Sequence, residues 1–149
     1  MDLRPATRDD LPAVVRLLAD DPLGATRERP EDPLPQAYLD AFAAMERQEG
    51  NSLIVAVEDG AVIGCLQLVL VPGLSRQGAI QAQIVGVRVR RDRRGAGIGA
   101  ALVRHAIDVA RSQGCRLVGL TTHASRTDAH RFYERLGFVS SHVGMKLEL

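Results

Sequence analysis

The sequence predicts an α/β fold, in which helices cover a central β-sheet. Segments with helical apolar spacing alternate with β-rich runs along the 149 residues, and this alternation favours a sheet with helices over a helix bundle. Two β-rich runs, residues 52–57 and 62–71, are joined through an Asp-Gly pair and are typical of an antiparallel hairpin. A long amphipathic helix joins the runs at 79–89 and 117–120, which predicts two parallel neighbouring strands.

Length and composition indicate one globular domain over residues 1–149. A hydrophobic content of 46% is sufficient for a sizeable core, and the chain is too short for two such cores. The formal net charge of +1 gives no broad field that would attract nucleic acid or an anionic membrane. The start has no apolar signal core, and no apolar run approaches the length of a membrane span.

The two cysteines, Cys65 and Cys115, lie in apolar segments without metal-ligand spacing. We therefore expect buried free thiols, no metal site and a reducing cytoplasmic location.

The pattern of residues 1–48 predicts a short strand followed by two helices with a loop between them. Thr7 and Asp10 resemble a capping box that starts a helix ending near Asp20. Five prolines and glycines interrupt residues 21–35, so this segment is a long loop, either a functional lid or a mobile connector. Residues 36–48 form a second helix with Phe42 in the core.

The C-terminal half predicts two more helices and a last strand. Residues 97–113 carry a wide apolar stripe, and Gly114 offers a left-handed stop. A shorter helix begins near Ser125 and ends at Gly137. Met145, Leu147 and Leu149 alternate with charged residues, which predicts a half-buried final strand.

A glycine-rich stretch joins the end of the strand at 79–89 to the long helix. Gly95, Gly97 and Gly99 remove side chains where a strand hands over to a helix, so backbone amides can approach an anion. Arg93 and Arg94 add positive charge, which suits a phosphate or pyrophosphate. A dinucleotide site would need an acidic residue at the end of the next strand, and a nucleotide-hydrolase loop would need Gly-Lys-Ser/Thr; this sequence has neither. A purely structural turn remains an alternative.

Two motifs in order resemble the GNAT superfamily of N-acetyltransferases. The first is similar to that family's Gln/Arg-x-x-Gly-x-Gly/Ala pyrophosphate loop and follows a Val-x-Val strand; it reads Arg94-Gly95-Ala96-Gly97-Ile98-Gly99. The second resembles the family's Ala-x-x-Phe-Tyr-x-x-x-Gly-Phe segment, and it runs from Ala129 to Phe138. The resemblance implies a central, twisted, mixed but mostly antiparallel sheet of about six to seven strands flanked by about four helices, in the order β-α-α-β-β-β-α-β-α-β-β.

The resemblance implies acetyl-CoA as the cofactor, with CoA as the product. Its pantetheine arm would pair with the backbone of Val87 and Val89, and Gly86 is a plausible position for a bulge that frees this edge. The pyrophosphate would be held by the backbone amides of Arg94, Gly95, Ala96, Gly97, Ile98, Gly99 and Ala100.

The resemblance also implies a general acid, and it shows that the usual general base of the family is not present in this sequence. Tyr133 matches the tyrosine that donates a proton to the departing thiolate, whereas the glutamate that many relatives place on the strand is Val85 here. His123 or an acid from the loop at 21–32 could replace it.

Other family positions give weaker predictions. Gln81 and Gln83 lie on the same strand face as Val85 and could orient a water. We expect Gln83 and Phe42 to border the acceptor. His123 and Tyr133 have structural alternatives as a capping residue and a core residue.

The predicted activity is transfer of an acetyl group to a primary amine by direct attack in a ternary complex. A small-molecule amine is the favoured acceptor, and a protein lysine or N-terminus is the alternative. Because Val85 replaces the glutamate, a non-catalytic acyl-CoA-binding relative is a second class. A nucleic-acid module is disfavoured, since aromatic residues make up only 3% of the chain. Related proteins often dimerise, so a homodimer is allowed, and the sequence does not identify the acceptor.

Overall fold

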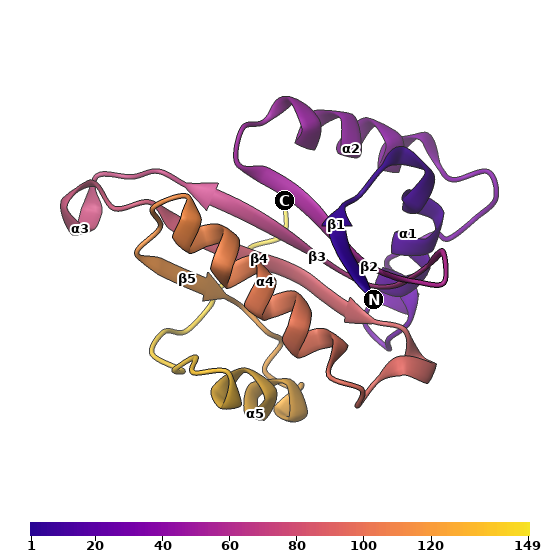
Figure 1. Ribbon diagram of the computed structural model, residues 1–149. Helices are drawn as coiled ribbons and strands as arrows, with labels where there is room; N and C mark the ends of the chain where they lie inside the picture. Colours follow the sequence, from indigo (N-terminus) through magenta and orange to yellow (C-terminus); the bar gives the residue numbers. More distant parts are fainter. The chain divides into compact units, whose positions relative to one another are not determined.

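The computed structural model describes all 149 residues, which divide into two compact units, residues 1–119 and residues 120–149. Helices and strands alternate as the sequence predicts (Figure 1). The elements are β1 (Asp2–Pro5), α1 (Leu11–Ala19), α2 (Gln36–Arg47), β2 (Asn51–Glu58), β3 (Ala61–Val71), α3 (Ser75–Gly78), β4 (Gln81–Val89), α4 (Ile98–Ser112), β5 (Leu117–Leu120) and α5 (Thr127–Arg135). Three short 3-10 turns lie at Arg8–Asp10, Gly24–Thr26 and Arg91–Arg93.

The five strands form one sheet in the order β1-β2-β3-β4-β5. The first three pairings are antiparallel, and the predicted hairpin between β2 and β3 turns at Asp59 and Gly60, whose φ angles are 50° and 76°. Positive φ at both central residues is what a tight hairpin turn requires and what Asp-Gly tolerates. The arrows of β4 and β5 point the same way in Figure 1, as the helical crossover through α4 requires.

A β-bulge interrupts β4 at the predicted position. Cys65 is opposite Arg88 and Gln67 is opposite Val85, so one residue of β3 faces two residues of β4. Gly86 lies in the bulge with φ of 64°, a conformation that glycine adopts without a Cβ clash. The pleat of β4 is therefore broken immediately before Val87.

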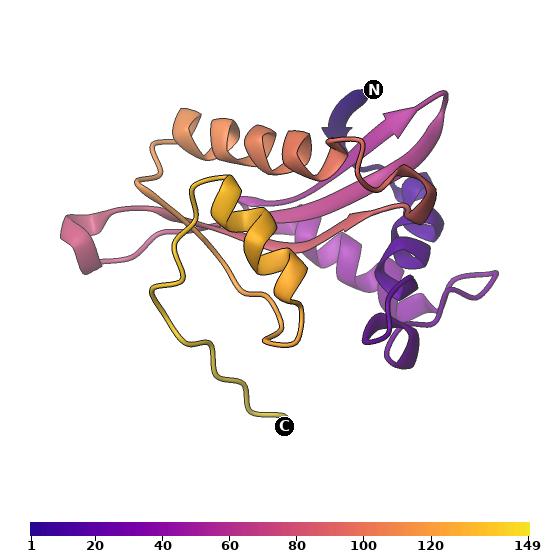
Figure 2. The same ribbon diagram turned by 90° about the horizontal axis from the view of Figure 1, so that it is seen from below.

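Helices cover both faces of the sheet in the first unit. Figure 2 shows α4 on one face and α1 and α2 on the other. Cys65 belongs to a buried cluster with Val14 and Leu17 of α1, whereas Gly64 faces Leu102 of α4, as alternation along a strand requires. No helix combines the length and the apolar character that a membrane span would need.

The second unit contains α5 and a small aromatic cluster. Tyr133 contacts Phe132 and Phe138 edge to face, with ring centroids 5.0 Å and 5.9 Å apart. Gly137, with φ of 96°, ends the helix, and the Phe138 N–H donates to the Tyr133 carbonyl at 3.1 Å. The Phe-Tyr and Gly-Phe parts of the second motif thus fold against each other.

The two strands predicted after the last helix are absent. The α/β class is confirmed, but the sheet has five strands instead of six to seven, and residues 138–149 carry no helix or strand. Met145, Leu147 and Leu149 are exposed rather than half-buried. Alternation specifies two faces of a strand but not the neighbour that must supply its hydrogen bonds, so the pattern alone cannot place it.

The cysteines are free, as predicted, but only one is buried. Cys65 is 1% exposed, and this burial raises the pKa of its thiol to about 12. Cys115 follows the left-handed Gly114 and is half-buried, so the expectation of full burial was wrong there.

Asp10 connects β1 to the start of α1. Its carboxylate accepts two hydrogen bonds from Arg4, at 2.7 Å and 3.0 Å, and one from the Thr7 backbone at 2.7 Å, which completes the predicted capping box. Although Asp10 is only 8% exposed, these donors, with Arg4 first, lower the pKa of its carboxyl from 3.8 to about 2.

We predict that Asp10→Asn lowers the free energy of unfolding at neutral pH by about 1–2 kcal/mol, a value reduced for the partial exposure of Arg4. Because the pKa of Asp10 is lower in the folded state than in the unfolded state, its carboxylate contributes to the free energy of unfolding above about pH 4. This contribution is lost as the pH falls toward 2. Urea unfolding at several pH values should show a flatter acid limb for the variant. Asp9→Asn, at the exposed neighbour, is the control, and an equal loss there would contradict the assignment.

Candidate functional site

The glycine-rich loop lies where β4 leads into α4. Gly95 and Gly97 adopt φ of 79° and 80°, and residues 94–97 are exposed. Gly97 is the N-cap of α4, no side chain caps this end, and no acidic residue lies in the first turn. The first amides of a 15-residue helix thus face outward at its positive end. This geometry suits an anion, and the pyrophosphate role of the loop stays a prediction.

Five arginines around this loop each have an acidic partner, so they are not merely solvated charges at a strand end. The pairs are Arg88–Asp21, Arg90–Asp92, Arg91–Asp20, Arg93–Glu58 and Arg94–Asp20. Asp20 appears twice, so five guanidinium groups face four carboxylates. The cluster keeps an excess positive charge at the end nearest the glycines.

Asp20, at the end of α1, holds two of these side chains. Its carboxylate accepts from Arg91 at 2.7 Å and from Arg94 at 3.4 Å, and its backbone carbonyl accepts from Arg94 at 3.1 Å. Arg94 also donates from Nε to the Val89 carbonyl at 3.1 Å. These contacts orient the Arg94 guanidinium beside the loop. The sequence alone does not indicate Asp20, because its partners Arg91 and Arg94 lie 71 and 74 residues further along the chain.

Asp21 ties the start of the 21–35 loop to β4. Its Oδ2 lies 3.0 Å from Arg88 Nε, and the two side chains are only 14% and 15% exposed. Its other oxygen accepts from the Gly24 N–H at 2.6 Å. Further along the loop, the Tyr38 hydroxyl donates to Glu28 at 3.0 Å and accepts from the Arg29 N–H at 2.9 Å. The loop is therefore held at its start and near its middle.

The predicted residues on β4 and α2 differ in accessibility. Val85 is 44% exposed, and Gln83, Val87 and Val89 are half-buried around the bulge. Phe42 is only 8% exposed. Phe42 therefore belongs to the core of the first unit, and its contact with an acceptor stays a prediction.

His123 is engaged in a local cap. The Ser125 backbone N–H donates to His123 Nδ1 at 3.2 Å, and the Ser125 Oγ lies 2.7 Å from the same nitrogen. Because an N–H points at it, Nδ1 serves as an acceptor, and its lone pair is occupied. This geometry favours the capping alternative for His123 over the general base.

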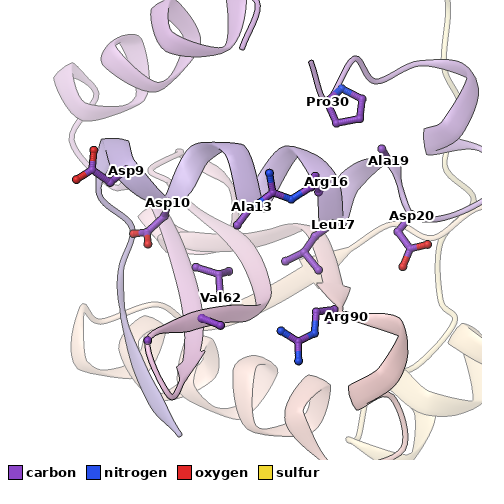
Figure 3. A pocket seen from close by; sticks show the side chains of 12 residues that line it. Asp9, Asp10, Ala13, Arg16, Leu17, Ala19, Asp20, Pro30, Val62 and Arg90 are labelled. Carbon is purple, nitrogen blue, oxygen red and sulfur yellow. The ribbon is translucent and has the colours of Figure 1, made fainter. Parts of the chain in front are cut away.

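A cleft of about 690 Å³ lies beside α1 (Figure 3). Charged side chains of Asp9, Arg16, Asp20 and Arg90 line it together with Pro30. It contains none of the residues that the sequence assigned to the cofactor or acceptor. Two of its lining residues connect it with the loop: Asp20 contacts Arg91 and Arg94, and the Arg90 carbonyl accepts from the Arg93 N–H.

Comparison with known proteins assigns the fold to a family. Residues 11–138 match the model of the acetyltransferase (GNAT) family. The chain is 32% identical to the glucosamine 6-phosphate N-acetyltransferase of Trypanosoma brucei brucei, over 100% of this chain and 96% of that protein. It is 33% identical to the aminoalkylphosphonate N-acetyltransferase of Salmonella typhimurium, over 95% and 86%. A crystal structure described as a transcriptional regulator from Bacillus halodurans C-125 superposes with a TM-score of 0.97 at 47% identity, covering 99% of both chains.

The chain therefore belongs to the GNAT acetyltransferase family, as the two sequence motifs predicted. It is an acetyltransferase of the GNAT type.

Proposed function

We propose that this enzyme transfers the acetyl group of acetyl-CoA to the primary amine of a small molecule by direct attack in a ternary complex. The observation that carries the proposal is the exposed loop at residues 94–99, with two left-handed glycines, an uncapped helix start and a surplus of positive charge. Acetyl-CoA supplies an activated thioester when bound; the protein supplies binding, orientation and proton transfer.

The residues present fit the two parts of this cofactor. A pyrophosphate would be held by the amides of residues 94–100, and Arg94 would add charge-assisted hydrogen bonds. A pantetheine arm would pair with the backbone of Val87 and Val89, immediately after the Gly86 bulge. The tight pairing of Arg88, Arg90 and Arg93 with acids disfavours a nucleic-acid surface, which needs available cations.

The acceptor we propose is a primary amine that also carries a phosphate or phosphonate group. Two relatives that match nearly this whole chain act, by name, on glucosamine 6-phosphate and on aminoalkylphosphonates. These compounds share an amine and a phosphorus oxyanion but not a carbon skeleton. The second group would supply binding energy for orienting the amine.

We propose that the amine proton leaves through water rather than through a carboxylate on β4. Val85 occupies the position of the glutamate, and Asp21 is held by Arg88 in a nearly buried ion pair. Gln81 and Gln83 on β4 would orient the water. Tyr133 would donate the proton that the departing thiolate takes.

The acceptor proposal is tested with acetyl-CoA and matched amines, with thiol release as the signal. We expect glucosamine 6-phosphate or 2-aminoethylphosphonate to exceed glucosamine or ethylamine in kcat/KM by at least about tenfold, since a charge-assisted hydrogen bond would be lost. The pH dependence should follow the ionisation of the acceptor amine. A preference for lysine or N-terminal peptides would overturn the acceptor class, and saturable binding without any transfer would support the non-catalytic alternative.

We predict that Tyr133→Phe lowers kcat about a hundredfold or more while the Kd for acetyl-CoA changes by less than about twofold. The change removes only the hydroxyl, and the ring contacts with Phe132 and Phe138 remain. Tyr38→Phe, at the chain's other tyrosine, loosens the loop at residues 21–35 instead, so we expect it to change the acceptor KM more than kcat. Unchanged turnover in Tyr133→Phe would remove this residue from the mechanism.

A further inference from the structure

Arg88 on β4 carries a buried donor that the chain itself does not satisfy. Its side chain is 15% exposed, and its Nε is a buried polar atom without a hydrogen-bond partner, although Asp21 Oδ2 lies 3.0 Å away as an ion-pair partner. Its Nη1 donates to the Val87 carbonyl at 2.9 Å. Buried donors in folded proteins nearly always have an acceptor, so an orphaned one calls for a partner from outside the chain.

The bulge in β4 decides which face of the sheet carries this side chain. Cys65 of β3 lies opposite Arg88, and it packs against α1. Gln67, two residues further along β3, lies opposite Val85 and shares the face of Cys65. Opposite residues of antiparallel strands share a face, so Arg88 and the exposed Val85 both lie on the side that α1 covers (Figure 2). Gln83, which orients the water in the function proposed above, lies on this same face.

The ion pair with Asp21 balances the charge of Arg88 without using the donor at Nε. The two side chains are 14% and 15% exposed, and a nearly buried cation without an anion beside it would be costly. Asp21 is also held by the Gly24 N–H, which donates to its Oδ1 at 2.6 Å. The carboxylate therefore keeps its place when the guanidinium binds a second anion.

Other arginines near the end of β4 have their donors engaged. Arg90 donates from two nitrogens to the two oxygens of Asp92. Arg94 donates to two backbone carbonyls. Arg88 differs, because its charge is balanced by an acid while its Nε–H has no acceptor.

We propose that Arg88 binds the phosphate or phosphonate group of the acceptor. This inference rests on the acceptor class proposed above. A guanidinium presents five donors in a planar fork, and this fork binds a phosphorus oxyanion through charge-assisted hydrogen bonds. Arg88 is then the residue that distinguishes a phosphorylated amine from a plain amine, and the oxyanion supplies the acceptor that its Nε–H lacks.

Matched acceptors test this assignment. The measured quantity is the ratio of kcat/KM for 2-aminoethylphosphonate to that for ethylamine, and likewise for glucosamine 6-phosphate and glucosamine. Arg88→Gln should lower this ratio at least about tenfold, mainly through the KM of the phosphorylated amine. Arg88→Lys keeps the charge but loses the planar fork, so it should recover part of the ratio. Arg104→Gln, on the exposed face of α4, should keep the wild-type ratio.

The outcomes separate this inference from the function on which it rests. A wild-type ratio that survives in Arg88→Gln would overturn the role of Arg88 and leave the acceptor class intact. Equal kcat/KM for both amines in the wild type would overturn the acceptor class and this inference together. A weaker Kd for acetyl-CoA with an unchanged ratio would assign Arg88 to the cofactor instead. Because Arg88→Gln leaves Asp21 without a counter-charge, the double variant Asp21→Asn, Arg88→Gln is measured as well, and it should show the same loss.

Discussion

The close packing of α4 against β3 at Gly64 is the constraint on which the glycine loop depends. A Cβ at Gly64 would lie 2.9 Å from Leu102 Cδ1 and 3.1 Å from the Arg88 carbonyl, so no larger residue fits without movement. Leu102 is fully buried there, and Ile98, at the helix start, is 4% exposed. The start of α4 is therefore fixed relative to the end of β4, and the connecting residues must turn sharply. Left-handed Gly95 and Gly97 make this turn and leave the helix amides exposed.

The end of α1 supplies the second part of the arrangement. Two consecutive aspartates there bind different arginines. Asp20 binds Arg91 and Arg94 beside the glycine loop, and Asp21 binds Arg88 on β4. The loop that begins with Asp21 is thereby anchored to the same strand that would carry the pantetheine arm. The loop at residues 21–35 and the glycine loop are therefore both held by the end of α1.

The sequence was sufficient for local structure and insufficient for long-range pairing. The Asp59-Gly60 hairpin, the Thr7–Asp10 capping box and the Gly86 bulge follow from short-range backbone preferences, and all three are present. Asp20 was missed because nothing local indicates which arginine an acid will meet 71 or 74 residues later. The prediction of a strand at residues 145–149 was wrong for the same reason. The apolar residues do alternate there, but the sequence does not indicate which strand would pair with them. The site roles of Tyr133, Val87 and Val89 remain predictions.

The central claim is that the glycine loop at residues 94–99 binds the pyrophosphate of acetyl-CoA. Its most direct test is a thermal-shift titration with acetyl-CoA and free CoA, with ATP as the control for simple phosphate binding. We expect a saturable rise in Tm with both thiol cofactors and little change with ATP. Gly97→Glu should abolish the rise, because a side chain and a negative charge would enter the anion site. Gly78→Glu introduces the same residue at an equally left-handed, open position outside the loop and should keep the rise. No shift in the wild type, or an undiminished shift in folded Gly97→Glu, would contradict the assignment of the loop.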